Sequence, residues 1–328
     1  MCNRFSRIDW TAPAAKIVMA VAGQARREET TCGSGTMVWH CWKGPPDQTP
    51  LVLLHGGWGS WTHWIKVILP LASKRTVYVA DLPGMGDSAD APKPHTSESL
   101  SNIIADGVEV LLSKDQQYHA ICFSFGGVMG AWMAVRHGQR CRSLTLVGAA
   151  GFGRLHFVVE GIRIPDPTLS DLEIYLVHRE NLKLLMFSDV DRIDALALYV
   201  HRHNIARGRV RSRRISLSEG LIEALPNIQS SIGGIWGSDD ATGGGSKDIL
   251  SREDIIRSYQ PNCKFDIIEG AGHWVMYEAA DQFCDTLETH LASYDKIGSI
   301  TNSNIVQLTA TQELTNKTLV SPTITGTG

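Results

Sequence analysis

Residues 122–127 (Cys-Phe-Ser-Phe-Gly-Gly) constrain the fold more than any other segment, because they join a buried strand directly to a helix. The apolar run at residues 118–121 predicts the strand, and residues 128–135 predict the helix. Small residues lie two before Ser124 and two and three after it, as a very tight turn requires. Such a turn lifts the serine oxygen out of the sheet, where a substrate carbonyl can reach it. The alternative is an ordinary strand–helix turn with a solvated serine.

Two further residues are candidates to form a catalytic triad with Ser124. His273 follows an apolar run at residues 265–268 that predicts a strand, and its loop position lets the side chain reach a neighbouring strand end. Asp239 and Asp240 follow the apolar residues 232–235, and a carboxylate there would orient a histidine base. The chain order is therefore serine, aspartate, histidine, which is the order that α/β-hydrolases use.

Several separate segments resemble the α/β-hydrolase fold family. Residues 51–59 (Leu-Val-Leu-Leu-His-Gly-Gly-Trp-Gly) are similar to the family's strand and His-Gly oxyanion loop, and residues 81–88 are similar to its turn after the next core strand. The serine, acid and Gly-His turns follow at similar intervals. The resemblance covers roughly residues 35–155 and 225–295. It implies an α/β fold in which helices flank a mostly parallel sheet, with a helical cap insertion.

The resemblance implies a role for each member of the triad. Ser124 would be the nucleophile, His273 the base and Asp240 the acid, because the family spacing after the glycine favours Asp240 over Asp239. Residues 144–151, the family's other location for the acid, contain no carboxylate. This absence strengthens the assignment of Asp240.

The resemblance also implies how the site would hold a substrate. The N–H groups of Phe125 and Gly57 would form the oxyanion hole, with Trp58 as the less favoured alternative to Gly57. Trp58 and Trp274 are the predicted substrate-binding residues, although tryptophans near this loop are equally compatible with core packing. The family's histidine at the position of His55 usually has a structural role, so the resemblance implies such a role for His55.

One position departs from the family pattern. The turn usually begins with glycine, and here Cys122 holds that place. Cysteine is small enough for the turn. Its place at a strand end directs it into the interior, where a cysteine is normally inert, so we do not expect Cys122 to be the nucleophile.

Composition narrows the function further. The formal net charge of −3 gives no support to a nucleic-acid or anionic-membrane partner, and no segment approaches the length of a membrane span. The seven cysteines form no Cys-x-x-Cys pair, which favours a reduced, cytoplasmic location over a zinc cage or a disulfide framework. We expect a small-molecule substrate as the partner, no cofactor and no metal, and leave a homodimer open.

The pattern along the chain predicts four regions. These are an N-terminal extension (1–33, with a helix at 14–25), an α/β core (34–151 and 226–297), a helical cap (152–225) and a flexible C-terminal tail (298–328). Two cap helices are predicted at residues 169–186 and 189–206, the second capped by Ser188 or Asp189.

The cap is rich in cationic and imidazole side chains. Its arginines either form a solvated basic face or supply one partner for a substrate carboxylate; they are Arg207, Arg209, Arg211, Arg213 and Arg214. His201 and His203 have no carboxylate or cysteine ligands near them in sequence, so they do not predict a metal site.

The first functional hypothesis is a cofactor-independent serine hydrolase that cleaves a carboxylic ester through an acyl-enzyme. The second is a C–C bond hydrolase of ring meta-cleavage products, because residues 272–274 and 277–278 are similar to that subfamily. Residues 57–60 lack the proline of its oxyanion loop. The third, from another class, is a ligand receptor that retains the hydrolase fold. Turnover of esters, turnover of a vinylogous diketo acid, or slow single turnover separates the three.

Overall fold

The computed structural model describes residues 5–155, 157–244 and 246–298, and its strands form one sheet. The strands are β1 (Arg26–Cys32), β2 (Gly35–Trp42), β3 (Leu51–Leu54), β4 (Val77–Ala80), β5 (Tyr118–Phe123), β6 (Cys141–Val147), β7 (Ser231–Gly237) and β8 (Lys264–Ile268). Their spatial order is β1-β2-β4-β3-β5-β6-β7-β8. β2 pairs antiparallel with β1 and β4, and every other neighbouring pair is parallel. The mostly parallel sheet predicted from the sequence is confirmed.

Helices cover both faces of this sheet, because the central strands are apolar on both sides. In β3, Val52 and Leu54 pack into one hydrophobic core and Leu51 and Leu53 into a second, since successive side chains of a strand point to opposite faces. The first core includes α3 (Ser97–Leu111), α4 (Phe125–His137) and α9 (Ser246–Tyr259). The second includes α1 (Ala14–Ala22), α2 (Ile68–Ala72), α10 (Val275–Glu278) and α11 (Ala280–Gly298).

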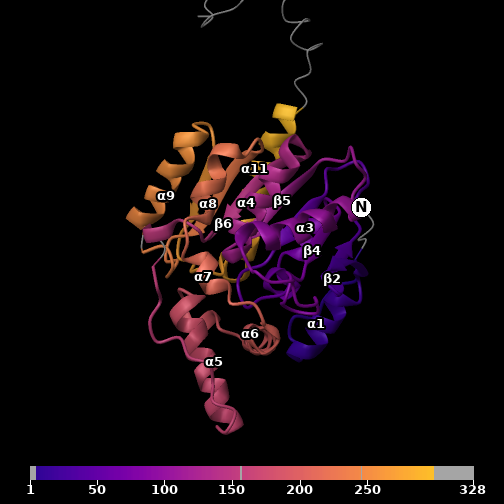
Figure 1. Ribbon diagram of the computed structural model, residues 1–328. Helices are drawn as coiled ribbons and strands as arrows, with labels where there is room; N and C mark the ends of the chain where they lie inside the picture. Colours follow the sequence, from indigo (N-terminus) through magenta and orange to yellow (C-terminus); the bar gives the residue numbers. More distant parts are fainter. Residues whose placement is uncertain (1–4, 156, 245, 299–328) are drawn as a thin grey trace, which may run out of the picture.

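Four α-helices of the described residues lie between β6 and β7, where the sequence predicts a helical insertion. They are α5 (Asp171–Leu185), α6 (Ala195–Arg207), α7 (Ser212–Ser216) and α8 (Gly220–Ala224). Figure 1 shows α5 extending away from the sheet, whereas α6 lies close to α1. α6 packs against both α5 and α1, and α7 and α8 pack against α4. The insertion is thereby joined to the core along several elements.

The second inserted helix begins later than the sequence predicted. Asp194 is its N-cap residue, and the Asp194 side chain accepts a hydrogen bond from the N–H of Ala197 at 2.7 Å. Asp189, one of the two predicted caps, instead caps a short 3-10 helix at Val190–Arg192. Asp189 and Asp194 are both suited to cap a helix. In the structure each caps a different one, Asp189 the 3-10 helix and Asp194 the helix α6 that follows it.

The sheet also begins earlier than predicted. β1 lies within the segment assigned to the N-terminal extension, and the helix before it ends at Ala22. The charged run at residues 26–29 suits an edge strand, because Arg26 pairs with Glu28 on one face of the strand and Arg27 with Glu29 on the other. Charged side chains of this kind keep an exposed strand from pairing with another molecule.

The C-terminal tail predicted from the sequence lies outside the described residues from 299 onward. Within the described ranges, no helix has both the length and the apolar character needed to cross a bilayer. Six cysteines in these ranges are free thiols, namely Cys32, Cys41, Cys122, Cys141, Cys263 and Cys284.

Candidate active site

Ser124 lies in the turn between β5 and α4 with its backbone in a strained conformation. Its φ of 51° and ψ of −117° are rare for a residue with a side chain. Its N–H donates to the carbonyl of Val147 at 2.9 Å, which fixes the turn against the end of β6. A Cβ atom on Gly126 would lie 2.6 Å from the carbonyl oxygens of Leu54 and His55, so this close approach requires glycine. Glycine at position 126 therefore permits the tight turn that holds Ser124 in this conformation.

The side chain of Ser124 is joined to His273 and Asp240 by hydrogen bonds. Ser124 Oγ lies 3.0 Å from His273 Nε2, and His273 Nδ1 lies 2.8 Å from Asp240 Oδ2. Because a carboxylate can only accept, His273 Nδ1–H donates to Asp240 and leaves Nε2 to accept from the serine hydroxyl. The three predicted residues are therefore brought together in the arrangement that a serine triad requires.

Asp240 is the buried carboxylate of the acid turn, and Asp239 is exposed. The other oxygen of Asp240, Oδ1, accepts from the N–H and the hydroxyl of Thr242, both at 2.8 Å. Burial alone would raise the pKa of Asp240. The charge of His273 and the hydrogen bonds from His273 and Thr242 outweigh burial, so the pKa lies below its ordinary value. The Asp240 carboxylate is thus kept ionised beside the histidine.

A buried arginine supports this acid turn. Arg252 of α9 is fully buried, and its Nη2 donates to the carbonyl of Thr242 at 2.6 Å and to that of Leu155 at 2.5 Å. Its positive charge also lowers the pKa of Asp240. No sequence motif indicates an arginine that comes after the acid turn and folds back beneath it, so Arg252 could not be predicted from the sequence.

Glu278 anchors the loop that carries His273. Its Oε2 accepts from the N–H of Gly272 at 2.7 Å and from that of Ser188 at 3.1 Å, and its Oε1 accepts from the N–H of Asp189 at 2.8 Å. One carboxylate therefore joins the histidine loop to the chain that follows α5. The sequence drew attention to Glu278 only through a subfamily similarity and gave it no role.

The predicted oxyanion donors lie beside each other at the ends of β3 and β5. Phe125 is the first residue of α4, and the first N–H groups of a helix have no partner within it. A Cβ atom on Gly57 would lie 3.7 Å from the Cβ of Phe125, so these backbones are neighbours. Residues 56–62, which we call the β3 loop, include Trp58 with a left-handed φ of 54°. This placement fits the predicted pair of donors.

His55 precedes the β3 loop and has both ring nitrogens engaged. The N–H of Leu82 donates to His55 Nε2 at 2.9 Å, so Nδ1 carries the hydrogen and donates to the carbonyl of Gly56 at 2.7 Å. Burial lowers the pKa of His55 to about 4, although the charge of Asp81 opposes this. A neutral, fully bonded ring of this kind fixes the loop and has no free nitrogen for proton transfer.

The two predicted substrate-binding tryptophans have different surroundings. Trp58 is partly exposed and its ring lies against Gly208, the residue that caps the end of α6. Trp274 is 1% exposed, and its Nε1 donates to the carbonyl of His63 at 2.7 Å. Its ring also contacts Phe187. The contacts of Trp274 are those of a core side chain, and its contact with a substrate stays a prediction.

Two of the inserted arginines bind carboxylates of the protein itself. Arg207 Nη1 lies 2.7 Å from Asp87, and Arg209 Nε lies 2.5 Å from Asp90. Both aspartates belong to the segment that follows β4. These two guanidinium groups therefore connect the insertion to the core. Within the described residues, no group of three or more potential ligands is arranged to hold a metal ion.

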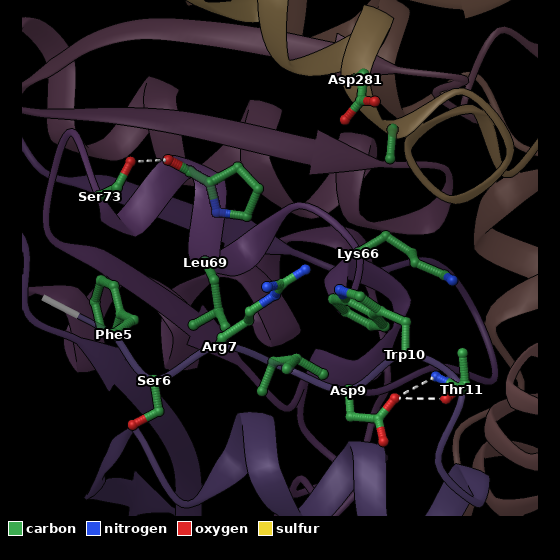
Figure 2. Close-up of a pocket in the computed structure, with 13 residues that line it drawn as sticks. Phe5, Ser6, Arg7, Asp9, Trp10, Thr11, Lys66, Leu69, Ser73 and Asp281 are labelled. Carbon is green, nitrogen blue, oxygen red and sulfur yellow. Dashed lines mark hydrogen bonds between the residues drawn. The ribbon is translucent and has the colours of Figure 1, made fainter. Parts of the chain in front are cut away.

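A surface pocket of about 990 Å³ lies apart from these residues, and Figure 2 shows its lining. It lies between the N-terminal segment and α2, beside the start of α11. The Lys66 ammonium is 4.8 Å from the centre of the Trp10 ring and 3.5 Å from Asp194. None of the triad residues lines this pocket, so it is separate from the candidate active site.

The chain belongs to the alpha/beta hydrolase family, as its sequence motifs predicted. Residues 51–286 match the family described as "Alpha/beta hydrolase family". This range contains Ser124, Asp240 and His273.

Two relatives and one solved structure illustrate what the chain resembles. The dihydrolipoyllysine-residue acetyltransferase component of an acetoin cleaving system from Pseudomonas putida is 29% identical over 71% of this chain. The match spans 61% of that relative, less than two thirds of its length. The 2-hydroxy-6-oxononadienedioate/2-hydroxy-6-oxononatrienedioate hydrolase from Paraburkholderia phymatum is 25% identical over 71% of this chain and 83% of that protein. The esterase RhEst1 from Rhodococcus sp. ECU1013 has the same fold, with a TM-score of 0.65, 20% identity, and 83% and 99% of the two chains covered.

Proposed function

We propose that this protein is a serine hydrolase that cleaves a carboxylic ester through an acyl-enzyme intermediate. The observation that carries the proposal is the unbroken chain of hydrogen bonds from Ser124 through His273 to Asp240, at 3.0 and 2.8 Å. Membership of the alpha/beta hydrolase family supports hydrolysis as the class of reaction.

In the first step, Ser124 Oγ attacks the ester carbonyl while its proton passes to His273 Nε2. The carbonyl oxygen becomes an oxyanion, which the N–H groups of Phe125 and Gly57 stabilise. The N-terminal end of α4 adds its positive dipole at the same place. His273 then gives its proton to the leaving alkoxide, and the C–O bond of the ester breaks.

In the second step, water attacks the acyl-enzyme and gives its proton to His273 Nε2. The acid is released and the proton returns to Ser124 Oγ. Asp240 keeps the Nδ1 hydrogen of His273 in place and stabilises the imidazolium that forms in both steps. We propose that the inserted helices α5–α8 act as the cap that excludes water and selects the acyl group.

A C–C bond hydrolase is the second candidate. It is favoured by the likeness to the Paraburkholderia phymatum hydrolase, of which 83% is covered. Substrates of that kind carry a carboxylate, for which an inserted arginine would be the partner. Arg207 and Arg209, two of the five inserted arginines, pair instead with Asp87 and Asp90 of the protein itself.

The test is labelling with a fluorophosphonate probe, followed by mass spectrometry of the modified peptide. We expect rapid labelling at Ser124 that is lost in Ser124→Ala and retained in Cys122→Ala, the control for a thiol nucleophile. Turnover of 4-nitrophenyl esters of increasing chain length supports the ester hydrolase, and turnover of a vinylogous diketo acid alone supports the second candidate. A folded protein that neither labels nor turns over either class contradicts both and favours a ligand receptor.

A further inference from the structure

The inserted helix α6 and Gly208, the residue that caps its end, contact the β3 loop at two places. Asn204 Oδ1 accepts hydrogen bonds from Ser60 Oγ at 2.7 Å and from Thr62 Oγ1 at 3.2 Å. Four residues later, Gly208 leaves room for the Trp58 ring, because a Cβ atom there would lie 2.5 Å from it. Asn204 therefore holds the end of the loop on both sides of Trp61, and Gly208 contacts its middle at Trp58.

Hydrogen bonds from the core hold this loop near its two ends, and Gly57 lies against Phe125 of α4 and Ser212 of α7. His55 bonds the first residue of the loop and Leu82, and Asp81 Oδ1 accepts from the N–H of Trp61 at 2.8 Å. Between these anchors, Trp58 has a left-handed backbone. A residue with a side chain keeps such a conformation only where its surroundings enforce it. The ring of Trp58 lies against Gly208, the residue that follows α6.

The polar cluster on α6 is enclosed and well bonded. Asn204 is 3% exposed, and Ser60 and Thr62 are also buried. Ser60 Oγ donates to Asn204 Oδ1 and accepts from the N–H of Thr62 at 3.2 Å, with the Thr62 hydroxyl 2.7 Å away. Within the described residues, Asn204 Nδ2 has no hydrogen-bond partner. The acceptor oxygen of Asn204 is therefore the part of the amide that holds the loop.

We propose that Asn204 is a positioning residue for the oxyanion hole. Through Ser60 and Thr62 it fixes the β3 loop, so that the N–H of Gly57 points at the oxygen that becomes negative. The proposal rests on the proposed function, because it assumes that Gly57 donates to an oxyanion. It adds that a residue of the insertion, far from the triad in sequence, controls the rate of the chemical step.

The test compares changes at two buried asparagines of the insertion. Asn204→Leu removes the acceptor and keeps the branched shape of the side chain, whereas Asn204→Asp retains an acceptor oxygen. The matched control is Asn181→Leu in α5, since Asn181 is 2% exposed and bonds only the backbone of Arg163, at 3.0 and 2.6 Å. With 4-nitrophenyl butyrate as substrate, we expect Asn204→Leu to lower kcat about 10- to 100-fold with KM nearly unchanged. This loss in kcat is no larger than the loss caused by removing a whole oxyanion donor.

Asn204→Asp should restore kcat to within about 3-fold of the original protein, and Asn181→Leu should leave it unchanged, because a bond outside the loop does not position Gly57. Adding Ser60→Ala to Asn204→Leu should cause no further loss, since both changes break the same bond. Equal kcat in Asn204→Leu and the unmodified protein overturns the proposal. So does an equal loss in Asn204→Leu and Asn181→Leu, which would indicate general damage to the insertion.

Hydrogen–deuterium exchange of the peptide that covers residues 56–62 separates this proposal from the proposed function. Asn204→Leu should accelerate exchange in that peptide and Asn181→Leu should not. If the unmodified protein fails to react with fluorophosphonate or ester, the proposed function is wrong, and the exchange result still decides whether Asn204 holds the loop. Unchanged exchange in Asn204→Leu overturns the positioning role.

Discussion

The thiol of Cys122 fills the space beside Gly130 that a side chain at position 130 would need. Cys122 is fully buried at the end of β5, and a Cβ atom on Gly130 would lie 3.0 Å from the Cys122 Cβ and closer still to its sulfur. Burial also raises the pKa of the Cys122 thiol well above its ordinary value, so it stays protonated and inert. The departure from glycine at the start of the serine turn is therefore accommodated by a glycine on the helix that packs against it.

Substitutions at Cys122 and Gly130 should have strongly non-additive effects on the free energy of unfolding. We expect Gly130→Ala to lower the free energy of unfolding by about 1–3 kcal/mol through overpacking, although alanine is the better helix former. In a Cys122→Gly background, the same change should be neutral or stabilising, because the space is then free. Urea unfolding of the four proteins of this double-mutant cycle measures the coupling. Additive effects would mean that the two positions do not compete for one space.

The two aspartates of the acid turn should differ sharply in their effect on activity. Asp240→Asn disturbs the tautomer of His273 and should lower kcat by about 10⁴-fold, as in other serine triads. Asp239→Asn is the matched control, since the exposed Asp239 carboxylate accepts, among the described residues, only from Ser238 at 3.1 Å and Ser188 at 3.4 Å, and kcat should stay within about 2-fold. Steady-state ester hydrolysis by both variants checks this. A larger loss in Asp239→Asn would reverse the assignment of the acid.

Glu278→Gln should loosen the loop that carries His273. The Glu278 carboxylate now accepts hydrogen bonds from the N–H groups of Gly272, Ser188 and Asp189. In glutamine, the NH2 group would face one of these donors and could not accept from it. We expect kcat to fall about 10-fold, and the free energy of unfolding to fall by about 1 kcal/mol, because a partly buried donor loses its acceptor.

The matched control for this change is Glu180→Gln. Glu180 makes an exposed ion pair with Lys183 at 3.3 Å. Such a pair contributes little to stability, so both activity and unfolding should be nearly unchanged. Thermal melts and ester kinetics of the two variants provide the comparison. A Glu278→Gln protein with unaltered kcat would show that Glu278 does not position the histidine.

The sequence predicts the triad because each of its members follows a strand of one parallel sheet. Ser124, Asp240 and His273 come directly after β5, β7 and β8, or within a short turn of them, and the carboxyl ends of parallel strands meet at one edge. Local patterns are therefore enough to bring these residues together. The same patterns predict the helix–strand alternation.

The supporting residues could not be predicted, because their roles arise from contacts between distant segments. Asn204 meets Ser60 across 144 residues of sequence, and Glu278 meets Ser188 across 90. In the sequence, Arg252 looks like any charged residue on the exposed face of a helix. The packing of α9 in the structure shows that it is buried. No periodicity or motif encodes such contacts.

Stability should fall as the solution is acidified below about pH 6.5, well before the carboxylates titrate. Burial lowers the pKa of His55 to about 4 and that of His63 well below its ordinary value of 6.5. Because these folded-state pKa values lie below the unfolded ones, the unfolded chain binds more protons as the pH falls from about 6.5 to about 4, and stability is lost in that window. His55 alone should cost about 2 kcal/mol between pH 7 and pH 5.

Urea unfolding at a series of pH values, with His55→Gln as the variant, tests this origin. Glutamine retains an acceptor for the N–H of Leu82 and does not titrate, so the variant should lose about 2 kcal/mol less than the original protein on acidification from pH 7 to pH 5. His203→Gln is the control, because His203 is exposed on α6, and its pH dependence should match that of the original protein. An identical pH dependence in His55→Gln would show that the buried ring is not the group that couples protonation to unfolding.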